Sequence, residues 1–161
     1  MGQLSQRFGK VGYKGEVGEN FLYGVLQQDY QVSDYRQDMV MQTQGIDFGI
    51  KKPEWRREYT LDVKNTLYID KNNEYFSFKI ELESNSQPGW FFTSKADRIY
   101  HTNAYMGKYI YYELNKLRYY VNKKLIAQEY STFKIVPHNG DILMQFQISD
   151  AKHDIPISIM Y

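Results

Sequence analysis

The alternation of apolar and polar residues over 75–83 constrains the fold more than any other feature of the chain. Every second side chain in this run is apolar, namely Phe76, Phe78, Ile80 and Leu82. The residues between and after them are polar, namely Ser77, Lys79, Glu81 and Glu83. Because successive side chains of a β-strand point to opposite faces, the run predicts a strand with one face in a core. Segment 59–69 also reads as a strand, and the turn-forming residues 70–73 predict that the two strands pair as a hairpin.

The other predicted elements are a mixture of helices and strands. Apolar spacing predicts a helix over 15–28, with Val17, Phe21, Val25 and Gln28 on one stripe and Leu22 and Leu26 beside it. A further helix is predicted over 115–127. Ser94 and Asp97 resemble a capping box that begins a short helix. Short strands are predicted over 39–41, 46–51, 90–92, 108–114, 132–136 and 142–148. This order of elements predicts an α/β fold with a mixed β-sheet.

Length and composition limit the class of protein. The 161 residues fit one domain over 1–161, in which the glycine-rich residues 1–14 read as a flexible basic arm. A mean hydropathy of −0.63 argues against a membrane span, and no signal-peptide pattern precedes the first helix. The absence of cysteine excludes disulfides and thiolate metal sites, and it fits a reducing compartment, so the cytoplasm is the expected location.

The residues with the clearest chemical meaning lie in Leu61-Asp62-Val63-Lys64. In a strand, Asp62 and Lys64 project from the same face, while Leu61 and Val63 point the opposite way into a core. The preceding predicted strand carries Asp47, with Ile46 and Phe48 expected on its other face. If the two strands pair, the carboxylates of Asp47 and Asp62 converge.

Two converging carboxylates repel each other unless a cation neutralises them. Mg²⁺ is a natural cation for such a site, because it is held by one or two carboxylates together with water and substrate phosphate. The metal lowers the pKa of a bound water and stabilises negative charge on phosphate, and a neighbouring lysine helps to orient or deprotonate that water. Asp47, Asp62 and Lys64 therefore predict phosphodiester hydrolysis. Ordinary strand charges, with Lys64 as a salt-bridge partner, are the simpler interpretation.

This arrangement resembles the PD-(D/E)XK nuclease superfamily, in which a strand Asp and an (Asp/Glu)-x-Lys on the next strand form the metal site. The resemblance covers residues 15–65 and implies a restriction-endonuclease-like fold, with a mixed central β-sheet flanked by α-helices. It also implies an acidic residue on the first helix, where Glu19 is the matching position and Glu16 the fallback. The chain departs from the pattern in having Ile46 in place of Pro and an additional strand over 75–83.

Candidate substrate contacts lie in two segments. The net charge of only +1 means that a nucleic-acid binder must concentrate its cations locally. Between the two predicted catalytic strands lie four cations and a tryptophan: Lys51, Lys52, Trp55, Arg56 and Arg57. They are interpreted as a phosphate clamp with a stacking ring or as a solvated turn. Ser94 and Lys95 lie at the predicted helix start. They are interpreted either as a phosphate site that uses the free N–H groups of the first turn or as plain helix capping.

The expected function is an Mg²⁺-dependent deoxyribonuclease, with Mn²⁺ as a substitute and no small-molecule cofactor. Small size and the lack of a sequence-reading module favour an endonuclease acting on single-stranded or branched DNA. The resemblance further implies a homodimer, as in resolvase-like members, and a phage or mobile-element source. Glu81 is either solvated or an additional helper of the metal. The alternatives are a non-catalytic nucleic-acid-binding module and an assembly protein that uses its tyrosines as a contact surface.

Overall fold

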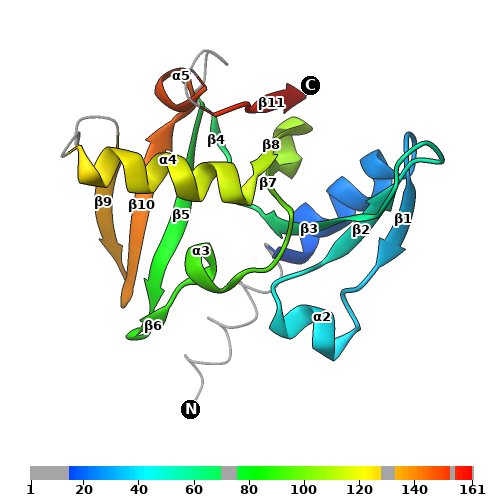
Figure 1. Ribbon diagram of the computed structural model, residues 1–161, viewed down its shortest axis with the longest axis horizontal. Coiled ribbons are helices and arrows are strands. Elements are labelled where there is room, and N and C mark those ends of the chain that lie inside the picture. Colours follow the sequence, from blue (N-terminus) through cyan, green and yellow to red (C-terminus); the bar gives the residue numbers. More distant parts are fainter. Residues whose placement is uncertain (1–14, 70–75, 128–132, 153–154, 161) are drawn as a thin grey trace.

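The computed structural model describes residues 15–69, 76–127, 133–152 and 155–160 (Figure 1). The expected basic arm over 1–14 and the expected turn over 70–73 lie outside these ranges. The first helix spans residues 15–26. The other helices are α2 (Met39–Thr43), α3 (Trp90–Thr93), the 3₁₀ turn η1 (Ala104–Met106), α4 (Leu114–Ile126) and α5 (Ile148–Ala151). None of the helices in these ranges is both long and apolar enough to cross a membrane.

A mixed sheet of six strands carries the candidate site. In spatial order its strands are β1 (Gln31–Asp34), β2 (Phe48–Lys51), β3 (Tyr59–Lys64), β7 (Arg98–Asn103), β8 (Lys108–Glu113) and β11 (Ser158–Met160). All neighbours are antiparallel except β3 and β7, which run parallel. The α/β class and the mixed sheet expected from the sequence are confirmed.

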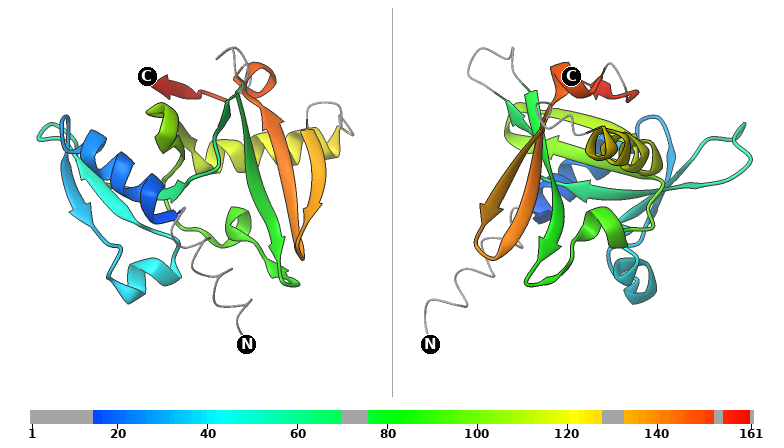
Figure 2. Two further views of the ribbon diagram at one scale, coloured as in Figure 1. Left: turned by 180° about the vertical axis from the view of Figure 1, so that it is seen from behind. Right: turned by 60° about the vertical axis from the view of Figure 1, so that its left-hand side comes forward.

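A second, antiparallel sheet packs against the first one. It consists of β4 (Tyr68–Ile69), β5 (Phe76–Ser84), β10 (Asp141–Gln147) and β9 (Phe133–His138), with β6 (Gln87–Pro88) pairing with β5. The β4–β5–β6 segment and α3 together form the connection from β3 to β7. In Figures 1 and 2 this sheet stands beside the six-stranded sheet, and α4 crosses it.

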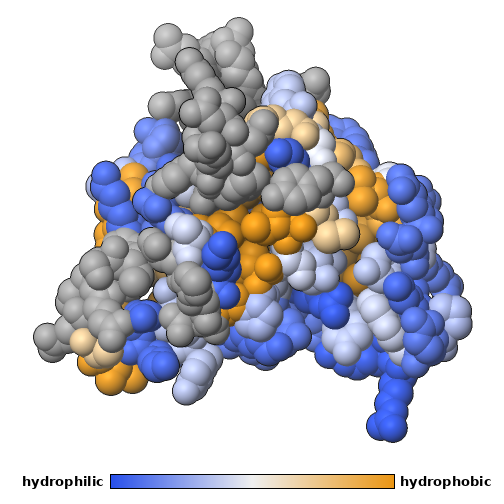
Figure 3. Space-filling view, turned by 90° about the horizontal axis from the view of Figure 1, so that it is seen from above, coloured by the Kyte–Doolittle hydropathy of each residue, from blue (hydrophilic) through white to orange (hydrophobic). Residues whose placement is uncertain are grey.

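Two hydrophobic clusters fill the two faces of the six-stranded sheet. The smaller cluster joins Leu22 and Leu26 of the first helix to Phe48, Leu61 and other residues of the sheet. The larger cluster lies between β7–β8, the second sheet and α4, and its members include the following residues: Phe78, Ile80, Ile99, Tyr112, Leu117, Val121 and Phe146. On the face seen in Figure 3, hydrophobic side chains gather near the centre, within a more hydrophilic surround.

The first helix buries a different stripe from the expected one. Gly18, Leu22 and Leu26 are buried, whereas Val17 and Val25 are only half-buried. Gly18 sets this orientation, because a Cβ at that position would lie 2.6 Å from the Thr102 hydroxyl and 2.8 Å from the Asn65 Cβ. The missing side chain allows the helix backbone to approach the ends of β3 and β7 closely.

The expected hairpin of 59–69 with 75–83 is largely wrong. Segment 59–69 divides into β3 and β4, since the chain turns after Lys64, where the Thr66 N–H donates to the Lys64 carbonyl. β3 pairs with β2 and β7, and only Tyr68–Ile69 pairs with β5. The hairpin expected near the C-terminus is confirmed as β9–β10.

Three short elements also differ from the expectation. Residues 39–41 lie in helix α2 rather than in a strand, because the Asp38 carboxylate caps it by accepting from the N–H groups of Val40 and Met41. Residues 90–92 form helix α3 rather than a strand. No helix begins at Ser94, whose hydroxyl instead donates to the Gly45 carbonyl in the connection to β2.

Candidate metal and catalytic site

Asp62 and Lys64 lie on the face of β3 that looks toward the larger core. Asp62 is 1% exposed, and the Lys64 Nζ lies 2.7 Å from its Oδ1. Among the described residues, the other carboxylate oxygen, Oδ2, is buried without a hydrogen-bond donor. A buried acceptor that lacks a donor costs free energy, so this oxygen is suited to a further partner.

Asp47 immediately precedes β2 and is hydrogen-bonded to Leu61 and Val63, the two neighbours of Asp62 on β3. The β2–β3 register pairs Phe48 with Leu61, and the Asp47 N–H extends that ladder by donating to the Leu61 carbonyl at 2.8 Å. The Asp47 Oδ2 accepts from the Val63 N–H at 2.8 Å, and its Oδ1 accepts from the Gln42 amide at 3.2 Å. The two carboxylates therefore lie in the same part of the sheet, and the charge of Asp47 contributes to the raised pKa of Asp62. Ile46, however, packs in the larger core and Phe48 in the smaller one, because the regular strand starts only at residue 48.

The two charged groups on β3 stabilise each other's charged form, and burial acts against both of them. Burial raises the pKa of Asp62 to about 6, with Asp47 adding to the rise and Lys64 opposing it. Burial disfavours the Lys64 ammonium, but Asp62, Asp47 and Glu81 outweigh this effect and raise the pKa of Lys64. Lys64 is thus a stable ammonium, whereas Asp62 is poised to gain from a second positive charge.

Glu19 joins this group from the first helix. It is half-buried, and burial followed by the charge of Asp47 raises its pKa. The positive charges of Arg36 and Lys64 lower the pKa of Glu19 and so oppose this rise. Glu16, the fallback, is exposed, so the structure favours Glu19 as the acidic residue on the helix.

Glu81 approaches Lys64 from the second sheet. It is half-buried, burial raises its pKa, and one of its oxygens accepts from the Trp90 N–H at 3.3 Å. The charge of Lys64 lowers the pKa of Glu81, so Glu81 lies near the site although β5 belongs to the other sheet.

Trp90 and His101 border the site and were not expected from the sequence. The Lys64 ammonium lies 5.4 Å from the centre of the Trp90 ring, a distance typical of a cation–π contact. His101 is fully buried, with its nitrogens 2.8 Å from the Thr66 hydroxyl and 2.7 Å from the Tyr112 hydroxyl. Burial and the charge of Lys64 lower the pKa of His101 to about 3, so it is neutral. Neither residue occurs in a local motif that would have revealed its position.

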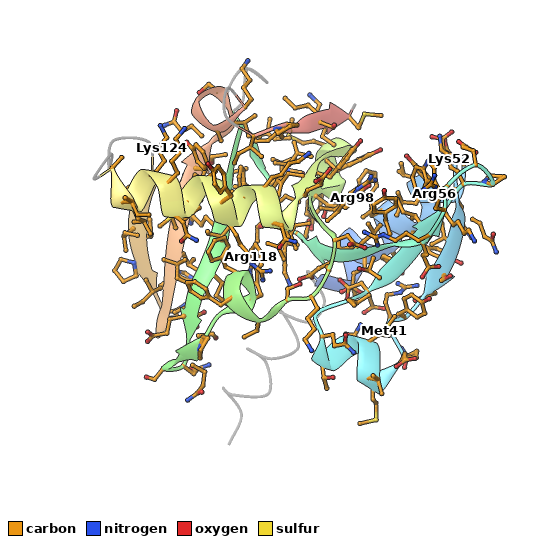
Figure 4. The ribbon with its side chains drawn as sticks, viewed as in Figure 1. Met41, Lys52, Arg56, Arg98, Arg118 and Lys124 are labelled. Atoms are coloured by element: carbon orange, nitrogen blue, oxygen red, sulfur yellow. The ribbon has the colours of Figure 1, made fainter. Side chains whose placement is uncertain are left out.

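The expected phosphate clamp lies at the other end of the β2–β3 hairpin. Lys51 ends β2, and the loop after it runs away from Asp47 before β3 returns toward Asp62. Figure 4 shows Lys52 and Arg56 at this distant tip. Trp55 is packed against Tyr30, Tyr59 and the Arg98 guanidinium rather than open for stacking. The structure therefore does not bring these residues to the site.

Arg57, the last residue of the expected clamp, lies apart from its other members and lines one cleft together with Ser94 and Lys95. The Arg57 guanidinium makes two hydrogen bonds to Asp97, at 2.7 and 2.8 Å. Ser94 is buried and Lys95 is exposed. Because no helix begins here, the expected phosphate site at a helix start is wrong.

The donor set suits a hard divalent cation. Its candidate ligands are carboxylate oxygens, and the buried Asp62 Oδ2 lacks a donor among the described residues. In the described part of the chain, no group of three or more His, Asp or Glu side chains is arranged around one point. Asp47 and Asp62, with Glu19 nearby, are the candidate ligands, and magnesium commonly takes only one or two carboxylates.

Comparisons with known proteins assign no family to this chain. No protein-family model matches the chain, and neither curated proteins nor solved structures give a match.

Proposed function

We propose that this protein is a Mg²⁺-dependent nuclease that hydrolyses phosphodiester bonds of DNA. The observation that carries the proposal is the position of Asp47 against Leu61 and Val63, the neighbours of the buried Asp62, with Lys64 on the same strand face as Asp62 and an Asp62 oxygen that lacks a donor among the described residues. A solvated strand pair would not need two buried carboxylates beside a half-buried lysine, since burying charge is costly unless it is compensated.

Each residue has a distinct proposed role. Asp47 and Asp62 would hold Mg²⁺ or Mn²⁺, which would supply a nucleophilic water at neutral pH and stabilise charge on the phosphate. Lys64, kept as an ammonium by Asp62 and bordered by Trp90, would donate to a phosphate oxygen or position the attacking water. Glu19 would orient Lys64 or that water from the first helix.

The order of elements supports a restriction-endonuclease-like core as part of the proposal. A helix precedes three antiparallel strands, β1, β2 and β3, and the next strand of the sheet, β7, runs parallel to β3. The connection from β3 to β7 carries much of a second sheet, where simpler members of the superfamily reach a helix sooner. This addition packs on the face of the sheet that carries Asp62.

The test is cleavage of labelled single-stranded, double-stranded and branched DNA, with an RNA strand for comparison, in Mg²⁺, Mn²⁺ or EDTA. Cleavage of single-stranded or branched DNA that requires the metal supports the proposal. An intact substrate in every condition would contradict it. Retained DNA binding would then favour a non-catalytic binding module, and a stable homomer without DNA binding would favour an assembly protein.

A further inference from the structure

A cleft lies next to the candidate site, between segment 92–97 and the first turn of α4. Its volume is about 430 Å³, and its lining includes Phe92, Ser94, Lys95, Asn115 and Arg118. Ser94 links the cleft to the site, because its hydroxyl donates to the carbonyl of Gly45, two residues before Asp47. Figure 4 shows Arg118 beside α3, far from Lys52 and Arg56 at the hairpin tip.

The acidic residues of the cleft are already paired with cations. The Asp97 carboxylate lies 2.7 Å from the Arg57 guanidinium and also accepts from the Thr60 N–H at 2.8 Å. The Glu113 carboxylate lies 3.1 Å from the Lys116 ammonium. Both negative charges of the lining are therefore compensated within the protein.

Two positive charges of the lining are not compensated in this way. The Arg118 guanidinium donates to the carbonyls of Phe91 and Ser94, both at 2.8 Å, so its hydrogen bonds are satisfied by neutral groups while its charge remains. Lys95 is exposed, and the described residues provide no acidic partner within ion-pair distance of its ammonium. The cleft is thus locally positive in a chain whose net charge is only +1, and it favours an anion.

Phe92 adds an exposed aromatic face at the same place. Its exposure is 58%, whereas the adjoining Phe91 is buried at 2%. The two rings meet edge to face with centroids 5.0 Å apart, so the buried ring supports the exposed one. Cations beside an aromatic platform form the combination that binds single nucleic-acid strands.

We propose that this cleft binds the single DNA strand that flanks the scissile phosphate, with a base stacked on Phe92 and a backbone phosphate on Lys95. Arg118 acts as a positioning residue, which fixes the carbonyls of Phe91 and Ser94 and supplies positive charge. The inference rests on the proposed nuclease function and specifies its substrate: the bound strand is single-stranded beside the site, because both faces of a base inside a duplex are already stacked on its neighbours.

The test is the affinity of the full chain for a fluorescein-labelled single-stranded oligonucleotide, measured by anisotropy in EDTA over a range of salt concentrations. Phe92→Ala is expected to weaken binding about fivefold or more, the effect of losing one base–aromatic stack. Lys95→Ala is expected to reduce the slope of log K against log salt by about 0.7, the value for one phosphate contact on a single strand. Tyr119→Ala and Lys152→Ala are matched controls, because both side chains are exposed and lie outside the cleft lining.

The outcomes separate this inference from the proposed function. If the wild type cleaves DNA, but Phe92→Ala and Lys95→Ala bind like their controls, the cleft inference is wrong and the nuclease proposal stands. If no DNA is cleaved while both variants bind more weakly, the cleft is confirmed as a nucleic-acid site and the nuclease proposal fails. If the wild type neither binds nor cleaves DNA, both are overturned.

Discussion

At the scale of single residues, the burial of the Asp62 carboxylate lowers the stability of the protein, while the same carboxylate is a proposed ligand of the metal. Its carboxylate is almost fully buried, faces Asp47, and has one charged partner, Lys64. Removing one partner of a buried charge pair is strongly destabilising, whereas replacing both partners by well-packed apolar residues is often neutral or stabilising. Such a position is expected where function, rather than stability, maintains the charge.

The first prediction concerns pH and stability in metal-free buffer. The pKa of Asp62 in the folded protein, about 6, lies above its ordinary value of 3.8. The folded state therefore binds this proton more tightly than the unfolded state, and the resulting stability is present below pH 4 and lost as pH rises through 6. The expected loss is up to about 3 kcal/mol, at 1.36 kcal/mol per pKa unit, and it should be absent in Asp62→Asn. Urea unfolding at several pH values measures it.

Asp97 provides the control of opposite sign. Burial alone would raise its pKa, but hydrogen bonds from Arg57 and Thr60 outweigh burial and lower it. The stability that Asp97 contributes is therefore present at neutral pH and lost as pH falls, so Asp97→Asn should flatten the acid side of the profile. A wild-type profile that Asp62→Asn leaves unchanged between pH 4 and 6 would contradict the assignment for Asp62.

At the scale of elements, the contact of the first helix with β3 and β7 positions Glu19. Gly18→Ala would place a Cβ 2.6 Å from the Thr102 hydroxyl and 2.8 Å from the Asn65 Cβ, so the helix must move away. We expect a loss of about 1–3 kcal/mol, typical of overpacking, together with reduced DNA cleavage because Glu19 moves with the helix. Urea unfolding and the cleavage rate measure the two effects.

Gly24 is the matched control on the same helix. A Cβ at this position meets nothing within 4 Å. Gly24→Ala should therefore stabilise the protein by about 0.5–1 kcal/mol, because glycine is unfavourable inside a helix. Equal effects of the two substitutions on stability and cleavage would show that the close approach at Gly18 does not position Glu19.

The elements also show how far the sequence predicts the structure. Alternation around Asp62 and in 76–84 predicts strands, because it reports directly which side chains face a core. It does not report strand partners, so the pairing of β3 with β7 rather than β5 was missed. His101 reaches the site through that pairing, opposite Lys64, and Trp90 reaches it from helix α3 in the connection between the two strands. The charged loop at 52–57 was placed beside the site from its position in the sequence, although the hairpin carries it to the opposite end.

At the scale of the whole molecule, a metal that binds only the folded state should stabilise it. With Mg²⁺ tenfold above its Kd, mass action gives about 1.4 kcal/mol, or a rise in Tm of about 3–6 °C for a chain of this size. Asp62→Asn should abolish the rise, while Asp34→Asn, a change in an exposed ion pair on β1, should retain it. Differential scanning calorimetry with and without Mg²⁺ measures the shift, and identical shifts in wild type and Asp62→Asn would contradict binding at this site.

The central claim is that Lys64, beside Asp47 and Asp62, takes part in phosphodiester hydrolysis. The most direct measurement is the single-turnover rate of DNA cleavage in Mg²⁺ for wild type, Lys64→Ala and the exposed control Lys152→Ala. We predict that Lys64→Ala lowers the rate by about 10²–10⁴-fold, that Lys152→Ala does not change it, and that EDTA abolishes cleavage in all three proteins. A folded Lys64→Ala protein that cleaves at the wild-type rate, or cleavage that persists in EDTA, would contradict the account.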